Sequence, residues 1–323
     1  MAKRIPLSEA DKDVHPVVLA VGQQMATFTL RDNIARLRAT LLAFKKVIET
    51  YESPQGHVFS RHFVPHVLNP QIEYLTECRP MCFAMGNAIR LLKARVTKLD
   101  LEISDEDGAK ELLEAVDTFI QERIVFAEYV IAANAAEMIV DGDIILTYGH
   151  QRLVRHAIQK ARDEGKEFEV AILDDPFDQT GQELAKKLRS IGIKVTYYPH
   201  LGGLRVNVKR ATKVMIGAEA LFANGSVYGP AGTCDIGMAA TDLGVPVVAL
   251  CETINFDRDR ISTESLTYNE IDPERSTEDA FRLLFDTTPD RYITAVVTEY
   301  ETGSGNSPAT AIQAILRKQE DSN

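Results

Sequence analysis

The sequence of 323 residues contains no tryptophan, no long hydrophobic run and fewer positive than negative charges. No apolar run approaches the ~20 residues that a membrane-spanning helix needs, so we expect no membrane partner. Met1–Asp13 is polar and lacks the apolar core of a secretory signal, so we expect a cytoplasmic protein. Lys and Arg number 36 against 47 Asp and Glu, a net charge of −11 that argues against direct binding to nucleic acid.

Cysteine is scarce as well, and its spacing excludes the common thiol-based sites. Four cysteines are present: Cys78, Cys82, Cys234 and Cys251. None forms a CxxC pair, and we expect buried free thiols in a reducing compartment. Cys78 and Cys82 could supply two zinc ligands at most, and His62 and His66 share their spacing without an HExxH signature. We therefore expect no metal site and no cofactor.

The nucleotide-binding signatures are also missing. A dinucleotide site needs GxGxxG after the first predicted strand, where this chain has Tyr148-Gly149-His150-Gln151-Arg152. A P-loop is absent too.

The hydrophobic pattern changes character at Asp141-Gly142-Asp143. Residues 1–14 have no periodicity and are expected to form a disordered lead-in. Residues 15–140 follow the period of a helix, which predicts an all-helical N-terminal domain that ends in a single long helix over Glu111–Val140. From residue 141 the chain is expected to fold differently.

Residues 141–323 alternate between predicted strands and helices. This alternation predicts a Rossmann-like α/β domain whose mainly parallel sheet is covered on both faces, and a last helix over Ser307–Lys318. Its central stretch carries two buried strands, Val214–Ile216 and Val245–Leu250, which we expect to be joined by a glycine-rich turn and a helix. Ligands bind at the carboxyl ends of such strands, where Glu219 and Asn224 stand.

Several polar side chains allow both a functional and a structural interpretation. Arg79 precedes a helix-breaking proline and could bind an anion or form an interdomain ion pair. His150 follows a strand and could be catalytic or only hydrogen-bonded. Glu122 and Phe126 are four residues apart, so with Arg123 they could contact a partner or belong to an ordinary amphipathic helix.

Taken together, several segments resemble the regulatory subunits of eukaryotic translation initiation factor 2B, over the chain from about His15 onward. They are Glu77-Cys78-Arg79-Pro80, Met85-Gly86-Asn87-Ala88-Ile89, Gly142–Gly149, Ile216-Gly217-Ala218-Glu219, Ala223-Asn224-Gly225-Ser226-Val227, Gly232-Thr233, Val245-Pro246-Val247, Cys251-Glu252-Thr253, Asn269-Glu270, Phe285-Asp286 and Thr288-Pro289. Within the family the delta type is most similar, and the beta and alpha types are the alternatives.

The resemblance implies a non-catalytic regulatory subunit of the guanine-nucleotide exchange factor for initiation factor 2, in which an epsilon subunit carries exchange. Implied partners are a beta subunit, the alpha, gamma and epsilon subunits, and the alpha subunit of initiation factor 2, whose phosphorylation the complex senses. Glu122, Arg123 and Phe126 match the Glu-(Lys/Arg)-x-x-(apolar) segment that the family implicates in this sensing.

The same fold is shared with sugar-phosphate isomerases, and isomerase activity is therefore the alternative function. Where those enzymes carry a cysteine and an aspartate, this chain has Gly149 and Glu219. Glycine cannot transfer a proton, and displacing a catalytic carboxylate by ~1 Å can cost ~100-fold, so we expect no enzymatic activity. The resemblance leaves a relict ligand pocket formed by Arg79, Gly149, His150, Glu219, Asn224 and Asn269.

Overall fold

In the computed structural model, contacts divide the chain into two compact units, 1–124 and 125–323. The structure describes residues 13–258, 260–262, 268–277, 280–300 and 307–308. The expected lead-in and the last helix expected from Ser307 fall almost entirely outside these residues. The domain limits expected at residues 15, 140 and 141 stay a prediction.

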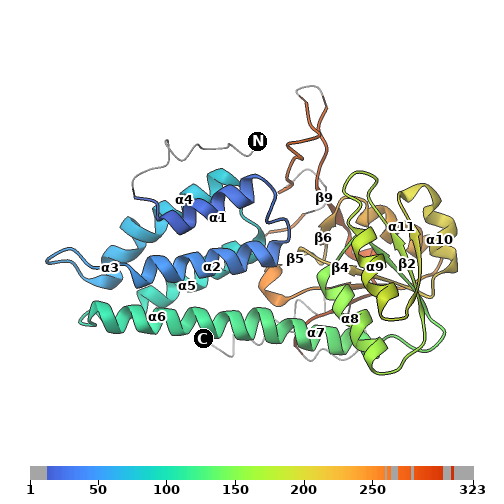
Figure 1. Cartoon of the computed structure of the whole chain (residues 1–323), viewed down its shortest axis with the longest axis horizontal. Coiled ribbons are helices and arrows are strands. Elements are labelled where there is room, and N and C mark those ends of the chain that lie inside the picture. The colour runs from blue at the N-terminus through green and yellow to red at the C-terminus, as the bar shows by residue number, and fades with distance from the viewer. Residues whose placement is uncertain (1–12, 259, 263–267, 278–279, 301–306, 309–323) are drawn as a thin grey trace. The chain divides into compact units, whose positions relative to one another are not determined.

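The first unit is built from helices. They are α1 (Pro16–Ala26), α2 (Asn33–Glu49), α3 (Phe59–Phe63), the π-helical turn η1 (Val64–Leu68), α4 (Asn69–Cys78), α5 (Phe83–Thr97) and α6 (Asp105–Ile120). Helix α2 packs against α1, α5 and α6, which run alongside it (Figure 1). Its apolar stripe of Leu37, Leu41, Phe44 and Ile48 is buried and forms the centre of this unit.

The single helix expected over Glu111–Val140 needs three corrections. It begins earlier, at Asp105, because the Ser104 hydroxyl accepts a hydrogen bond from the Asp107 backbone N–H at 3.1 Å and caps the first turn. A π-helical turn, η2 (Gln121–Phe126), follows α6. The next helix, α7 (Ala127–Glu137), ends three residues before Val140.

The second unit contains a parallel sheet. Its strands are β1 (Ile144–Tyr148), β2 (Glu169–Leu173), β3 (Lys194–Tyr198), β4 (Lys213–Gly217), β7 (Val247–Leu250) and β10 (Ala295–Val297). In the part of the chain that the structure describes, their order is β10-β7-β4-β1-β2-β3, and every neighbouring pair is parallel. The expected fold class, a helical N-terminal part followed by a Rossmann-like α/β part, is confirmed.

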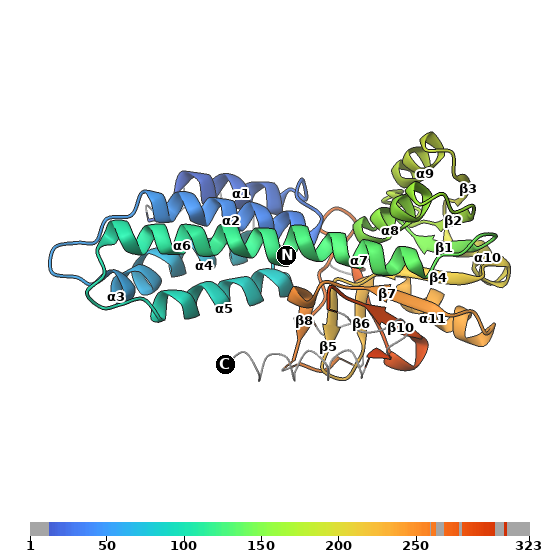
Figure 2. The ribbon, with the colours of Figure 1, turned by 90° about the horizontal axis from the view of Figure 1, so that it is seen from below.

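Helices cover both faces of this sheet (Figure 2). Along β1, Ile145 packs into a layer with α7 and the following helices, whereas Leu146 and Tyr148 pack into the opposite layer. The first layer contains α7, α8 (Arg152–Asp163) and α9 (Gly181–Ser190), and the second contains α10 (Leu204–Arg210) and α11 (Thr233–Asp242). The alternation of buried side chains is what a sheet buried on both faces requires.

The connection from β4 to β7 differs from the expected glycine-rich turn and helix. A hairpin of β5 (Ala220–Phe222) and β6 (Val227–Pro230) precedes α11, turning at Asn224-Gly225, where Gly225 has φ +82°. Asn-Gly between apolar residues is a strong signal for a hairpin, whereas we had expected only a turn before the helix. With β8 (Phe256–Asp257) and β9 (Phe285–Thr288) the hairpin forms a second sheet of order β8-β5-β6-β9.

Short 3₁₀ turns lie at Leu201–Gly203, Thr253–Asn255 and Asp290–Tyr292.

No helix among the described residues is long and apolar enough to span a membrane.

The cap at the start of α6 gives a stability test. Replacing Ser104→Ala should lower the free energy of unfolding by about 1 kcal/mol, because it leaves an amide of the first turn without its acceptor. Thr76→Ala is the control, since the Thr76 hydroxyl only donates to the Ile72 carbonyl on an exposed helix face. Urea denaturation followed by circular dichroism measures both, and equal losses would contradict the capping role of Ser104.

Candidate functional sites in the sheet and in the helical unit

The strand order places a topological switch point between β1 and β4. From β1 the chain proceeds to β2 on one side, whereas β4 lies on the other. Ligands in open α/β sheets bind at such a point, beside the carboxyl ends of the strands. Gly149 directly follows β1, and Glu219 stands two residues after β4. The structure therefore brings these two predicted pocket residues to the same edge of the sheet.

Gly149 has a backbone that a cysteine would not readily adopt. Its φ is +60°, in the left-handed region that favours glycine. A Cβ at this position would approach the Thr180 Oγ1 to 3.1 Å and the Asp174 Oδ1 to 3.8 Å. The Thr180 hydroxyl instead accepts a hydrogen bond of 3.1 Å from the backbone N–H of His150. Adding a nucleophilic side chain at residue 149 would therefore require both a strained backbone and a shift of Thr180.

Gln151 fills the space between the two strand ends, a feature that the sequence patterns did not reveal. Its Oε1 accepts a hydrogen bond from the backbone N–H of Gly217, the last residue of β4. Its amide nitrogen Nε2 is buried without a hydrogen-bond partner among the described residues. A side chain of the protein thus bridges the switch point.

Asn224 and Asn269, the asparagines predicted to line the pocket, form hydrogen bonds with backbone groups. The Asn224 amide donates to the Ser262 carbonyl at 3.0 Å, and the Asn269 amide donates to the Phe285 carbonyl at 2.6 Å. Asn269 Oδ1 in turn accepts from the backbone N–H of Phe285 at 3.1 Å. Both asparagines thereby hold the second sheet and its connections in place. Their role in a ligand pocket stays a prediction.

His150 and Arg79 also have structural partners. His150 Nδ1 lies 3.8 Å from a carboxylate oxygen of Glu183 on α9. Arg79, in the helical unit, is 2% exposed. Its Nη1 donates to the Leu30 carbonyl at 3.1 Å, and its guanidinium lies 4.2 Å from the centroid of the Phe28 ring. The assignment of both residues to a relict pocket likewise stays a prediction.

The positive end of α11 is occupied by a carboxylate of the chain itself. Asp286 on β9 is 8% exposed, and its Oδ2 accepts from the backbone N–H groups of Gly232 at 2.7 Å and Cys234 at 3.0 Å. Burial raises the pKa of Asp286 to about 6 in spite of these hydrogen bonds. A helix N-terminus is where a phosphate would otherwise bind, so this one is already filled.

A second buried carboxyl group lies at the same edge of the sheet. Asp174, directly after β2, is fully buried, and burial raises its pKa although the Tyr197 hydroxyl donates to it at 2.9 Å. Asp174 also accepts from the backbone N–H of Gly181 at 2.8 Å. Buried carboxylates of this kind disfavour a sugar phosphate. Among the described residues, no group of three or more metal-ligating side chains could hold a metal ion.

The cysteines lie in surroundings that disfavour a reactive thiolate or bury the thiol. All four are free thiols, and Cys78, Cys82 and Cys251 are buried as expected, whereas Cys234 is half-buried. Burial raises the pKa of Cys251, and burial together with Asp286 raises the pKa of Cys234 to about 11. The reactive thiolate of Cys234 and Cys251 is therefore rare at neutral pH.

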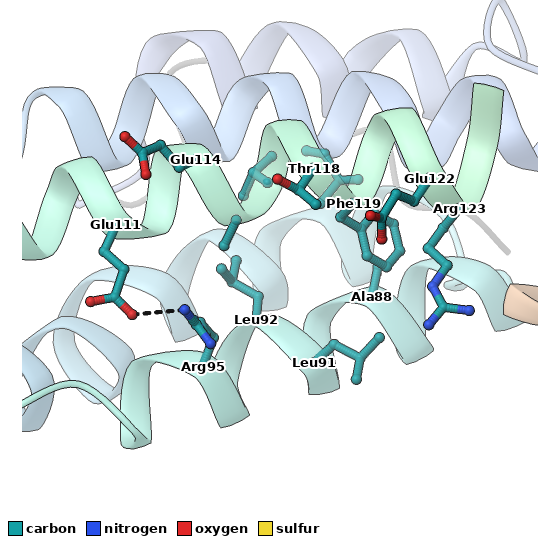
Figure 3. Close-up of a pocket in the computed structure, with 13 residues that line it drawn as sticks. Ala88, Leu91, Leu92, Arg95, Glu111, Glu114, Thr118, Phe119, Glu122 and Arg123 are labelled. Carbon is teal, nitrogen blue, oxygen red and sulfur yellow. Dashed lines mark ion pairs between the residues drawn. The ribbon is translucent and has the colours of Figure 1, made fainter. Parts of the chain in front are cut away.

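A second candidate site is a groove of about 450 Å³ in the helical unit. It lies between α5 and α6, with α2 at its base and η2 at one end (Figure 3). Its floor consists of side chains that are less than a tenth exposed: Leu41, Ala88, Leu92 and Val116. Leu91 on its wall is 53% exposed. The volume is in the range of ~300–1,000 Å³ that is typical of binding pockets.

Charged side chains surround this apolar floor. Glu111 and Arg95 form an ion pair of 2.9 Å across the groove, and Glu114 and Glu122 stand on its rim. Arg123 lines the groove beside Glu122. Glu122 and Arg123, two of the three residues predicted to contact a partner, thus line one groove. The sequence patterns had not indicated this groove.

Phe126, the third of these residues, lies in the π-helical turn η2 together with Glu122 and Arg123. Its side chain is 61% exposed. Tyr129 on α7 is 64% exposed. Large aromatic side chains with this exposure are characteristic of contact surfaces. Tyr129 was missed in the sequence, because aromatic spacing alone does not distinguish an exposed face from a buried one.

Comparison with known proteins places these sites in a family. A model of the Initiation factor 2 subunit family matches residues 30–303. Subunit delta of translation initiation factor eIF2B from Schizosaccharomyces pombe is 35% identical over 330 residues, covering 95% of this chain and 69% of that protein. The same subunit from Dictyostelium discoideum is 30% identical over 327 residues, covering 94% of this chain and 51% of that protein. The chain thus spans about two thirds of the first relative and about half of the second.

Solved structures and more distant relatives point to the same family. A chain of the tetrameric eIF2B-beta2-delta2 complex from Chaetomium thermophilum superimposes with a TM-score of 0.89 and 64% identity, covering 93% of this chain and 95% of that one. The expected similarity to delta-type subunits is confirmed. A ribose 1,5-bisphosphate isomerase from Haloterrigena turkmenica is 25% identical, covering 97% of this chain and 96% of that protein.

The raised pKa of Asp286 predicts a pH dependence. Because the native state holds this proton more tightly than the unfolded state, the contribution of Asp286 is complete below about pH 4 and is lost as the pH rises through about 6. Relative to Asp286→Asn, the parent should lose up to about 3 kcal/mol of unfolding free energy over this window.

Thermal melts across that pH range measure the difference between the parent and Asp286→Asn. Asp290→Asn, at an exposed position, is the control and should follow the parent. A parent and an Asp286→Asn curve that stay parallel would show that Asp286 is not held protonated by its surroundings.

Proposed function

The chain belongs to the initiation factor 2 subunit family, and on that premise we propose that it is a non-catalytic regulatory subunit of the guanine-nucleotide exchange factor for initiation factor 2. The observation that carries the proposal is its similarity, over nearly the whole chain, to two delta subunits and to a chain of a beta2-delta2 complex. In this proposal the chain acts in the cytoplasm.

Its first partner in this proposal is a beta subunit. The solved relative is named as a tetramer of two beta and two delta chains, which supports a heterodimer as the building unit. The alpha, gamma and epsilon subunits complete the complex, and nucleotide exchange is carried by epsilon. This chain then contributes assembly and sensing.

Sensing would occur at Glu122, Arg123 and Phe126. Phosphorylation of the alpha subunit of initiation factor 2 adds close to two negative charges and strong acceptor oxygens. Glu122 and Arg123 line a groove of about 450 Å³, and Phe126 is 61% exposed, which are properties of a protein contact. The π-helical turn that carries all three supports this assignment, because such turns occur frequently at functional sites.

Three observations support the absence of catalysis. Residue 149 is a glycine in the left-handed region, so the position offers no side chain for proton transfer. The Gln151 side chain bridges β1 and β4 where a substrate would enter. The carboxylate of Asp286 occupies the helix N-terminus nearby.

The sensing role predicts the behaviour of two variants. Glu122→Lys and Phe126→Ala should each reduce inhibition by the phosphorylated alpha subunit at least about fivefold, which corresponds to the ~1 kcal/mol or more of a significant contact residue. Both positions are exposed, so the complex should assemble normally. The measurement is a nucleotide-exchange assay on the reconstituted complex, titrated with phosphorylated and unphosphorylated alpha subunit.

Two variants at exposed positions outside the groove serve as matched controls. Glu73→Lys reverses a charge on α4, and Leu101→Ala removes an apolar side chain that is 53% exposed. Both should leave inhibition unchanged. Full inhibition in Glu122→Lys and Phe126→Ala would refute the sensing assignment.

The non-catalytic role predicts no turnover of ribose 1,5-bisphosphate. The purified chain, alone and with its beta partner, should give no ketose product by ³¹P NMR, with an authentic isomerase as the positive control. Gly149→Cys combined with Glu219→Asp should not restore activity, because a Cβ at residue 149 meets Thr180. Turnover by the parent chain would establish the isomerase alternative.

A further inference from the structure

Three histidines gather in the helical unit, outside both candidate sites. His57 lies in the loop of residues 51–58 between α2 and α3, His62 lies in α3 and His66 in η1. The ring centroids of His57 and His62 are 4.9 Å apart, and those of His62 and His66 are 4.6 Å apart. His62 is half-buried, whereas the other two are exposed. Rings this close can pack together while they are neutral, but they repel one another once they carry positive charges.

Tyr51 connects His62 to the loop. The Tyr51 hydroxyl lies 2.7 Å from His62 Nδ1. The Tyr51 ring packs edge-on against Phe59 and Phe63, whose centroids are 5.3 Å and 5.2 Å away. Burial raises the pKa of Tyr51, so the hydroxyl keeps its proton and can donate it to Nδ1 of a neutral His62.

The same loop is held at a second point. The Ser53 backbone N–H donates to Asp105 Oδ2 at 2.6 Å, and the Ser53 hydroxyl donates to Asp105 Oδ1 at 2.9 Å. The backbone N–H of His57 donates to the Pro54 carbonyl at 3.0 Å. Figure 1 shows the loop at the end of the helical unit, where α2 ends and α6 begins. These backbone N–H groups are therefore protected from exchange with solvent while the loop stays in place.

The charges that act on His62 oppose its protonation. Burial lowers the pKa of His62, and the positive charges of protonated His66 and His57 lower it further. Helices α5 and α6 also pack against α3, but in the part of the chain that the structure describes none of their charged groups shifts the pKa of His62. Asp105 on α6 acts on Tyr51 instead. The cluster thus lacks a carboxylate that would compensate its charge in acid.

From this geometry we propose that His57, His62 and His66 form an acid-sensitive latch, which holds the loop of residues 51–58 against α3 at neutral pH and releases it in acid. Because the native state binds a proton at His62 less tightly than the unfolded state, the stabilising contribution of His62 is complete above about pH 6.5 and is lost as the pH falls. Release uncovers the rings of Phe59 and Phe63, which are buried when the loop is in place. This device is independent of the proposed function.

Hydrogen exchange of the full chain, followed by mass spectrometry, measures the release. After correction for intrinsic rates, peptides with Ser53, His57 and His62 should exchange at least about tenfold faster at about pH 5.5 than at about pH 7.5, the equivalent of one pKa unit of differential proton binding. The backbone N–H groups of all three are hydrogen-bonded in the structure. The double variant His57→Gln/His66→Gln removes both like charges at exposed positions and should keep its protection in acid.

His200→Gln, in the second unit, is the matched control and should lose protection in the loop as the parent does. Proton NMR titration gives a second measurement: the pKa of His62 should lie below about 6.5 in the parent and rise towards it in the double variant. Asp286 titrates in the same range, but acid stabilises the chain through it, so its effect has the opposite sign. Unchanged protection of the parent in acid, or an equal loss in the double variant, would overturn the proposal.

Discussion

Parallel pairing of every strand in the main sheet is the constraint on which the second unit depends. Such a sheet leaves no face for water, so helices must pack on both sides, and each crossover ends with a strand whose carboxyl end meets the same edge. This geometry assembles a ligand-binding edge whether or not chemistry is retained there. In this chain the edge persists, but Gly149 contributes no side chain to it, the Gln151 side chain accepts a hydrogen bond from the end of β4, and Asp286 occupies the helix N-terminus. A fold that is shared with isomerases can thus be used in a subunit of a multi-protein complex.

Much of the fold could be predicted from the sequence. The predicted strands Val214–Ile216 and Val245–Leu250 match β4 and β7 to within two residues, because short β-branched apolar runs bounded by turns have few alternative structures. Strand β10 of the same sheet was not predicted. The change from helical to alternating pattern was also visible. Residues 149 and 219 lie at one edge of the sheet because they follow parallel strands, whose carboxyl ends meet at the same edge. Their role in a ligand pocket stays a prediction.

The remaining features depend on tertiary contacts that no local pattern encodes. The hairpin β5–β6 was missed because Ala220–Phe222 fits a helical period as well as a strand. The groove results from the packing of α5 against α6 and from the small Ala88 on its floor, so Glu114 and Leu91 looked like ordinary surface residues. The hydrogen bonds of Asn224 and Asn269 likewise connect segments far apart in the chain.

The burial of the native thiols has a practical consequence for spectroscopy. Burial raises the pKa of Cys78 and Cys251, Cys82 is 6% exposed, and the pKa of Cys234 rises to about 11. Maleimide reagents attack thiolates, which Cys78, Cys234 and Cys251 rarely form at neutral pH, and burial shields Cys82. One cysteine introduced at an exposed site such as Thr118 would therefore react far faster than the native four. A fluorophore could be attached there without first removing any of them.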